Sequence, residues 1–235
     1  MEHPFTWYSS LHPFLPYPLS LLGEPNFTAL IVMLVLLALA VRFRGSLTKA
    51  KDPVVPEERL SVRNAIEVLA EIVVGLSDSI IGKKGRKYVP LFGSLFLFIL
   101  LANLFGLIPG FTPPTSSFFN NLGMGLIVFF AYHYFGVREH GVLYFKQFMG
   151  PVLFLAPLFI VIELFSHVFR PVSLSIRLYG NMFGDHLVLE IFSNLTKLVV
   201  PVLFYVLGTL VSVIQAAVFT ILSVIYVAMA ISHEH

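Results

Sequence analysis

The sequence ELFSHVFRPVSLSIRLYGNMFGDHLVLE, from Glu163 to Glu190, places several ionisable side chains in a stretch whose flanks are apolar enough to cross a membrane. These side chains are Glu163, His167, Arg170, Arg177, Asp185, His186 and Glu190. Arg177 lies near the middle, and an arginine at bilayer depth costs from roughly 3 to over ~10 kcal/mol, depending on how it is measured. Such residues face protein or water and mark ion or substrate paths.

The spacing of these residues predicts two polar stripes on one helix. Glu163, Arg170 and Arg177 are seven residues apart, so they share a helix face with about 20° of drift per step. Asn181 lies four residues past Arg177 and continues that face. His186 lies nine residues past Arg177, which places it on the opposite side. Two stripes indicate two water-accessible surfaces rather than one.

The composition indicates an all-α polytopic membrane protein. The chain has 235 residues, of which 57% are hydrophobic and 12% charged, and its mean hydropathy is +0.87. Soluble domains average about 25% charged residues. The absence of cysteine excludes disulfides and thiolate metal sites. A net charge of +2 is too small to indicate a nucleic-acid partner. No signal peptide is expected, because residues 1–20 lack Lys and Arg and contain four prolines.

Apolar runs and basic clusters predict a single membrane domain with about five embedded helices. The expected segments are an extracytoplasmic arm (1–26), a first span (27–43), an amphipathic helix on the cytoplasmic surface (57–81), two further spans (88–109 and 118–137) and two long helices (150–192 and 202–231). Twelve of the fifteen Lys and Arg residues fall in the proposed cytoplasmic segments. By the positive-inside rule, the N-terminus is extracytoplasmic and the C-terminus cytoplasmic.

Length predicts that the last two helices are steeply tilted or bent. A helix of about 40 residues measures about 60 Å, twice the hydrocarbon thickness of about 30 Å. Pro157 and Pro171 are natural bend points in the first of them. The second carries small or polar residues at steps of three or four, which we expect to face the first. They are Gly208, Thr209, Ser212, Gln215, Ser223 and Tyr226.

Three features of the earlier segments leave alternatives open. The polar stripe of segment 57–81 fits a surface helix, which we favour because basic residues follow it, or a span packed on polar neighbours. Its members are Arg59, Arg63, Glu67 and Glu71. Asn103 lines a water path or bonds a neighbouring helix. We interpret His133 as an interfacial residue rather than a ligand.

Asp185, His186 and Glu190 are the groups in which chemistry is expected, and no nucleotide-binding loop accompanies them. Their interpretations are a proton relay, a buried hydrogen-bonded pair, or a metal site, which would need a further ligand from elsewhere. We favour the relay. Arg177 stays protonated at any relevant pH, so it cannot pass a proton on. Because proton-exchanging groups lie on both sides of it, Arg177 has the character of a separator between two half-channels. Glu163 is about 21 Å away along the helix, too far to neutralise it.

Three sequence stretches resemble subunit a of bacterial F-type ATP synthases. They are PVSLSIRLYGNMFGDHL (Pro171 to Leu187), IQAAVFTILSVIYVAMA (Ile214 to Ala230) and the ending HEH. The resemblance is specific from about Pro157 to His235 and looser in the earlier spans, including NLFGLIPG at Asn103 to Gly110.

This resemblance implies a proton-translocating stator subunit in the bacterial inner membrane, beside a rotating ring of c subunits. Its other implied partners are b-type peripheral stalk subunits, the rest of the synthase and the lipid bilayer. No cofactor or metal is implied, and the ATP chemistry belongs to other chains. Arg177 matches the family's essential arginine, which meets the ring's carboxylate. Asn181 and Gln215 match its polar companions, and Glu163 matches the acidic residue of the cytoplasmic half-channel.

The outer half-channel departs from the family pattern. His186 occupies the position at which many bacterial members carry Glu, and such members often have a facing His on the last helix. This chain has Gly208 there. Asp185, Glu190 and Ser212 are the candidates to complete the outer path.

Two rival functions predict different features. An independent secondary transporter is expected to show internal repeats and a substrate site near the membrane midplane, and the sequence shows no repeat. A membrane anchor without a transport role leaves the energetic cost of Arg177 unexplained.

Overall fold

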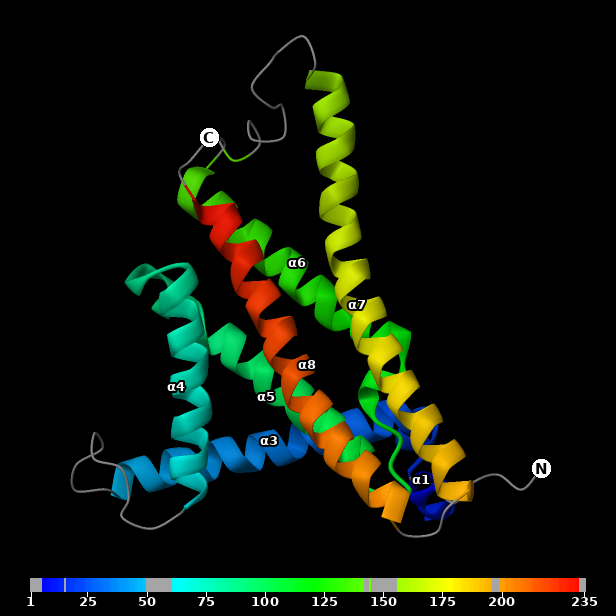
Figure 1. Cartoon of the computed structure of the whole chain (residues 1–235). Helices are drawn as coiled ribbons and strands as arrows, with labels where there is room; N and C mark the ends of the chain where they lie inside the picture. The colour runs from blue at the N-terminus through cyan, green and yellow to red at the C-terminus, as the bar shows by residue number, and fades with distance from the viewer. Residues whose placement is uncertain are drawn as a thin grey trace.

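The computed structural model describes residues 6–14, 16–49, 61–141, 144, 156–195 and 199–232, without the side chain of Glu190 among others. These residues form helices joined by short connections, and no strand occurs among them, which confirms the all-α class (Figure 1). The long helices are α3 (Glu24–Lys49), α4 (Val62–Ile80), α5 (Val89–Gly106), α6 (Phe118–His140), α7 (Ala156–Leu195) and α8 (Val199–Ile231). Short helical pieces are α1 (Trp7–Leu11), η1 (His12–Phe14), α2 (Tyr17–Ser20), η2 (Lys83–Tyr88) and η3 (Pro114–Ser116).

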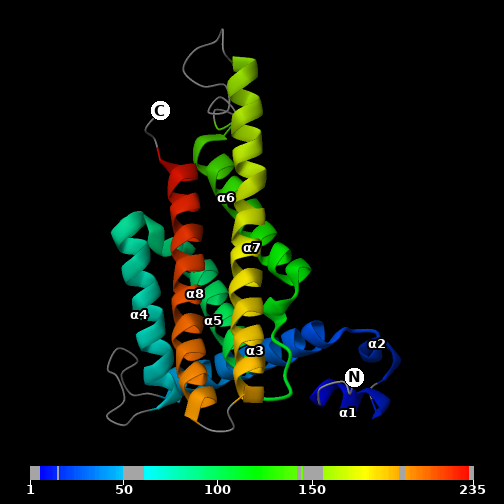
Figure 2. The same cartoon turned by 45° about the vertical axis from the view of Figure 1, so that its right-hand side comes forward.

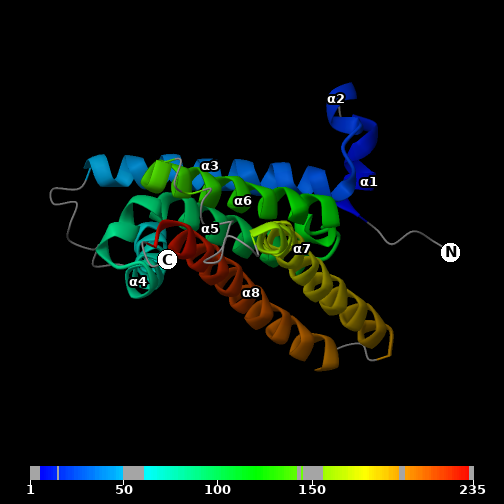
Figure 3. The same cartoon turned by 90° about the horizontal axis from the view of Figure 1, so that it is seen from above.

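The long helices are arranged in layers. Seen from above, α3 lies along one side, α5 and α6 lie in the middle, and α7 and α8 form the opposite side (Figure 3). The core lies where the middle layer meets α7 and α8, and its large side chains are fully buried. They include Phe92 and Ile99 of α5, Tyr132 of α6, Leu178 of α7 and Phe219 of α8. The flank of α7 and α8 that faces away from α3 therefore has no neighbour among the described residues.

A glycine sets the close contact between α6 and α7. A Cβ atom on Gly125 would lie 2.7 Å from the backbone oxygen of Pro171 and 3.1 Å from Ser175 Oγ. Pro171 lies inside α7, which is assigned as one continuous helix of 40 residues. The sequence therefore places a small residue on α6 where the backbone of α7 approaches most closely.

Local signals define several helix ends. Ser61 precedes α4, and its side chain accepts a hydrogen bond from the backbone N–H of Asn64 at 3.3 Å. Pro90 lies in the first turn of α5, where its missing N–H costs nothing. Gly141 ends α6 with a φ of +60°, in the region that glycine adopts without strain.

Contacts between distant segments define two ends of the bundle. At the end that we call inner, Lys87 Nζ lies 3.1 Å from Glu139 Oε2, which joins the start of α5 to the end of α6. At the end that we call outer, the Trp7 indole N–H donates to the Pro109 carbonyl at 3.1 Å. The predicted arm and the predicted turn after α5 therefore share one end, and basic segments share the other.

Four helices of the described residues are long and apolar enough to cross a membrane. Their spans are Glu24–Thr48, Lys83–Gly106, Pro157–Leu189 and Pro201–Ile231. The first extends beyond the predicted span 27–43 at both ends. α6, which the sequence predicts as the remaining embedded helix, is outside this set. Its asparagines, histidines and the ion pair at its inner end lower its hydropathy.

The predicted surface helix corresponds to α4, which begins at Val62; residues 57–60, with Arg59, lie outside the described part. Within α4, Arg63 Nε donates to Glu67 Oε1 at 2.6 Å, the expected pairing at a spacing of four. Arg63 is nevertheless buried, so the polar stripe does not simply face water. α4 runs across the direction of α3, as Figures 1 and 3 show. Likewise, residues 150–155 of the predicted fourth element lie outside the described part, which begins at residue 156.

Candidate functional site

Arg177 lies in the middle of α7 with an exposed side chain. The opposite side of the helix is fixed by Leu174, Leu178 and Met182, which recur every four residues and are buried. Their packing turns Arg177 away from the bundle. Among the described residues, no carboxylate forms an ion pair with its guanidinium. Arg177 is thus a permanent charge on the flank that the other helices leave uncovered.

Arg170 shares the predicted stripe with Arg177 but has a different environment. Its guanidinium carbon lies 5.8 Å from the ring centre of Tyr132 and 5.2 Å from that of Tyr226. These are cation–π distances. The heptad spacing predicted one face for both arginines. The structure separates them, because Arg170 lies over aromatic rings of α6 and α8, whereas no cation–π contact of Arg177 occurs among the described residues.

One turn beyond Arg177, a hydrogen bond joins α7 to α8. The Asn181 amide Nδ2 donates to Gln215 Oε1 at 2.6 Å. Gln215 is buried, with 4% of its surface exposed, and its own Nε2 has no partner among the described residues. The two residues implied as polar companions of the arginine are therefore brought together, and a buried amide N–H is left available beside them.

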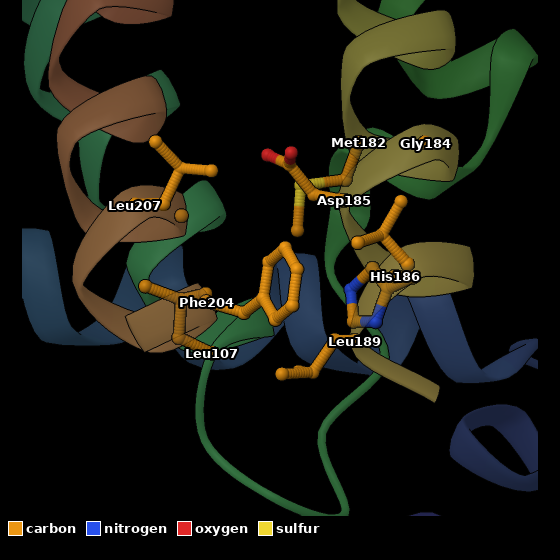
Figure 4. Close-up of a pocket in the computed structure, with 10 residues that line it drawn as sticks. Leu107, Met182, Gly184, Asp185, His186, Leu189, Phe204 and Leu207 are labelled. Carbon is orange, nitrogen blue, oxygen red and sulfur yellow. The ribbon is translucent and has the colours of Figure 1, made fainter. Parts of the chain in front are cut away.

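On the outer side of this bond, α7 and α8 enclose a cavity of about 280 Å³. Asp185 and His186 contribute its titratable groups, and the rest of the lining comes mainly from Leu107, Met182, Leu189, Phe204, Leu207 and Gly208. Figure 4 shows the Asp185 carboxylate directed from α7 toward α8, with the His186 imidazole on the same side of the cavity. Two of the predicted outer-path residues, Asp185 and His186, therefore line one cavity whose walls are otherwise mainly apolar. It has room for several water molecules.

Gly208 keeps this cavity open. A Cβ atom there would lie 2.8 Å from Leu107 Cδ2, so any other residue displaces the Leu107 side chain. Ser212, a further predicted outer-path residue, is buried one turn away and donates its hydroxyl proton to the Gly208 carbonyl at 2.7 Å. Its oxygen remains an acceptor, but Ser212 is not part of the lining. The side chain of Glu190 lies outside the described residues.

On the inner side, Glu163 contacts His167, an ionisable residue of the same stretch to which the sequence alone assigns no role. Its Oε1 lies 3.3 Å from His167 Nδ1, and the same nitrogen donates to the Glu163 backbone carbonyl at 2.9 Å. His167 stacks on His133 of α6 with ring centres 5.2 Å apart. His133 was expected at the membrane interface. The structure places it, half buried, against His167 and Tyr144. Only the crossing of α6 and α7 reveals this contact.

The described residues contain no group of three His, Asp or Glu side chains suited to a metal ion. Nor does Asn103 line a path there. It is buried, and its Oδ1 accepts the Thr115 hydroxyl proton at 2.7 Å, which ties α5 to the turn that follows. This leaves Arg177, the Asn181–Gln215 bond, and one proton-exchanging cluster on each side as the functional geometry.

Such a fold and site define a polytopic helical membrane protein. Its Arg177, in the middle of α7, is an unpaired cation between two groups of titratable side chains. Comparison with known proteins agrees. The family described as ATP synthase A chain matches residues 26–228. The chain is 49% identical over 193 residues to ATP synthase subunit a of Bdellovibrio bacteriovorus, covering 82% of this chain and 84% of that one.

Two further relatives extend the match. ATP synthase subunit a of Geobacter sulfurreducens is 43% identical over 174 residues, covering 74% of this chain and 76% of that one. ATP synthase subunit a 3 of Pelobacter propionicus is 37% identical over 238 residues, covering the whole of both chains. The chain therefore belongs to the ATP synthase A chain family, the proton-translocating subunit of the membrane sector.

Proposed function

We propose that this chain is the stator that forms two proton half-channels against a rotating ring of c subunits. The observation that supports it most directly is the position of Arg177. An exposed, unpaired arginine in a lipid-facing position costs from roughly 3 to over ~10 kcal/mol. A partner that brings a carboxylate to this flank removes that cost. A ring of membrane helices with a carboxylate at mid-depth has the required chemistry.

The surface around Arg177 suits such a partner. Apolar side chains are exposed along the same two helices, among them Ile176 and Phe183 of α7 and Leu210 and Ile214 of α8. α7 and α8 lie next to each other in Figure 2 and contact each other along part of their length. Their uncovered flank therefore offers a long apolar strip with one charge at its centre. A ring helix packs on the strip while its carboxylate reaches the charge.

Arg177 acts as an electrostatic barrier in this proposal. A fixed cation repels a migrating proton and favours the ionised form of any carboxylate beside it. A ring carboxylate that arrives protonated from one side loses its proton and leaves Arg177 only after it gains another from the opposite half-channel. Asn181 and Gln215 hold α7 against α8 at this level. The buried Nε2 of Gln215 has no hydrogen-bond partner among the described residues, so its hydrogens can bind the carboxylate.

The outer half-channel is the cavity lined by Asp185 and His186. Water in this cavity brings protons to the level of Asn181, and the imidazole exchanges them near neutral pH. The inner half-channel begins at Glu163. A proton that passes from outer to inner side through a potential of 100 mV releases about 2.3 kcal/mol. Rotation of the ring carries this energy to the chains that make ATP.

The arrangement of α3 and α4 supports the proposed orientation. If α3 crosses the bilayer, then α4, which runs across it, lies along the membrane surface at the basic end. α7 and α8 run between these two directions and are therefore tilted, as their length requires. We propose that α6 is embedded as well, between α7 and α5. The basic end is then cytoplasmic and the arm extracytoplasmic, by the positive-inside rule in a bacterial inner membrane. Peripheral stalk subunits of the b type are the further partners that the family implies.

The decisive experiment replaces Arg177 by Ala in the assembled synthase. We expect complete loss of gradient-driven ATP synthesis with the complex still assembled, since the exposed side chain contributes no internal contact. Arg44→Ala, an exposed arginine at the inner end of α3, is the control and retains synthesis. Coupled synthesis at a normal rate in the Arg177 variant contradicts the separator role. Co-purification with a small two-helix ring protein distinguishes the stator from a transporter or an anchor.

A further inference from the structure

A continuous series of proton-exchanging side chains runs through the inner half of the bundle. His133 of α6 and His167 of α7 have nearly parallel rings, with centres 5.2 Å apart and planes 23° apart. We call them the imidazole pair. Glu163 Oε1 lies 3.3 Å from His167, and the Tyr144 hydroxyl lies 2.7 Å from His133 Nδ1. The series therefore connects α7, α6 and the segment that follows α6.

Packing holds two members of the series in place. Tyr144 is 3% exposed and His167 is 8% exposed, so neither side chain is free to move into solvent. The Tyr144 ring fits against Gly136, where a Cβ atom would overlap its Cε2. Gly136 therefore makes the space that puts the Tyr144 hydroxyl beside His133. A tyrosine hydroxyl both donates and accepts, so it can complete a proton path.

Hydrogen bonding fixes the chemistry of His167. Because a backbone carbonyl only accepts, the Nδ1–H of His167 must donate to the Glu163 carbonyl. In the neutral ring, Nε2 is then the acceptor. A proton that arrives at Nε2 produces an imidazolium with the Glu163 carboxylate 3.3 Å away as its counter-ion. Transfer of that proton onward to His133 restores the neutral ring, so one proton has passed through.

The position of His167 along α7 matches an inner path. It lies ten residues from Arg177, about 15 Å along the helix, and one turn from Glu163. Between Arg177 and Glu163, it is the one residue of α7 whose side chain exchanges a proton near neutral pH. Arg170 also lies there, but it stays charged and cannot relay.

The charges around the imidazole pair limit it to one proton at a time. The facing groups are Glu163 and Arg170 on α7, Tyr132 on α6, Tyr226 on α8, and Tyr144. Two imidazolium ions at stacking distance beside the Arg170 cation repel each other strongly in a poorly solvated site. The pair therefore passes single protons rather than storing two.

We propose that the imidazole pair is the proton-conducting element of the inner half-channel, with Glu163 as its counter-ion and Tyr144 at its exit. This inference rests on the proposed function and deepens it. Each step moves one proton from an N–H or O–H group to a neighbouring N or O atom, directly or through one water molecule between the ring edges. Apart from these proton transfers, no covalent bond of the imidazole rings or of the backbone changes. Glu163 alone is then insufficient for full inner-side conduction.

The test uses the whole synthase in liposomes, with the pH of the two sides set independently. For His167→Gln and for His133→Gln we expect gradient-driven ATP synthesis to fall about 100-fold or more, the lower end for loss of a positioned proton-transfer group. The dependence of the rate on inner pH differs from that of the native synthase, because a proton-exchanging group of the path is gone. For His167→Ala, imidazole added on the inner side restores a measurable part of the rate.

Controls separate this inference from the proposed function. Ser166→Ala, on an exposed neighbour of His167, keeps the normal rate and pH profile. His186→Gln alters the response to outer pH instead. If both pair variants assemble and keep the normal rate and inner-pH profile while Arg177→Ala abolishes synthesis, the relay is wrong and the stator function stands. A loss in His167→Ala that imidazole does not restore assigns the pair a structural role and also overturns the relay.

Discussion

Asn181 Nδ2 donates a hydrogen bond to Gln215 Oε1 at 2.6 Å, and this bond crosses from α7 to α8 one turn from Arg177. It is a side-chain bond between two long helices that otherwise meet through apolar and small residues. Gln215 is buried, so its amide pays a desolvation cost that Asn181 offsets. The bond therefore fixes the relative position of the two helices at the depth where the ring carboxylate is proposed to bind.

We predict that Asn181→Leu destabilises the complex by about 1–3 kcal/mol, because it leaves the buried Gln215 oxygen without a donor. The double variant Asn181→Leu/Gln215→Leu regains part of this loss, since neither buried polar group remains. Thermal unfolding of the purified synthase measures both effects. Additive losses, without recovery in the double variant, show that the two side chains are not coupled.

Gly208→Val is expected to slow passive proton flow from the outer side. The new side chain displaces Leu107 and fills the cavity that Asp185 and His186 line. Proton flux through membranes stripped of the ATP-forming sector reports the change. Leu107→Ala in the same chain makes room again and restores flow. Gly93→Val is the control, because open space surrounds that position on α5. Unchanged flux in Gly208→Val removes this cavity from the path.

Gly125→Val is expected to reduce assembly of the complex, because the clash is with the backbone of α7 at Pro171 and no rotamer relieves it. Overpacking of this kind typically costs about 1–3 kcal/mol. Gly123→Val provides a matched control two residues away, on an exposed side of α6 with open space. Immunoblotting of membranes measures the amount of assembled chain. Equal amounts in both variants contradict the proposed close contact.

Glu24 is predicted to hold the arm at the outer end. Its two carboxylate oxygens accept from the Thr6 and Thr112 hydroxyls, each at 2.9 Å. In Glu24→Ala, the arm separates from the turn after α5. Trp7, the single tryptophan of the chain, then shifts its fluorescence toward that of an exposed indole in nanodiscs. Thr48→Ala, at the far end of α3, leaves the spectrum unchanged. If the Trp7 fluorescence of Glu24→Ala stays the same as in the native chain, the arm is attached through Trp7 itself rather than through Glu24.

The Asp78–Arg86 ion pair predicts a pH effect at the end of α4. The guanidinium, 2.6 Å away, holds the pKa of the Asp78 carboxyl below its ordinary value. A lowered pKa means that the pair stabilises the fold above about pH 4 and that this contribution disappears as the pH falls through the folded pKa. Asp78→Asn therefore lowers the melting temperature slightly at pH 7, and this difference shrinks as the pH falls below about 4. Because the pair is at the surface, high salt reduces the difference.

Much of the helical architecture follows from local sequence. Long, largely apolar runs predicted α3, α5, α7 and α8, because such runs satisfy their backbone only as helices in lipid. The ends shifted by a few residues, as for α3, since helix formation continues past the apolar run into Glu24 and Lys49. α6 was also predicted, although its composition places it outside the four clearly apolar helices.

The site was only partly visible in the sequence. The free-energy cost of an arginine in an apolar stretch indicated, from the sequence alone, where along α7 the proposed site lies. Spacing alone placed Arg170 in the same environment, which is wrong, because a helical repeat does not say which neighbour covers each turn. The contact of His133 with His167 was not predicted either. The two residues lie on different helices, and no local pattern predicts that crossing.

Sequence by itself determined that this chain is a bundle of membrane helices with a charged centre, since both properties depend on residue type and order along one helix. Tertiary structure alone decided which side of α7 is covered. That choice leaves Arg177 exposed, buries His167 against His133, and opens a cavity at Asp185 and His186. The physical reason is that a helix presents every side equally until a neighbouring surface of matching shape, such as Gly125 against Pro171, selects one.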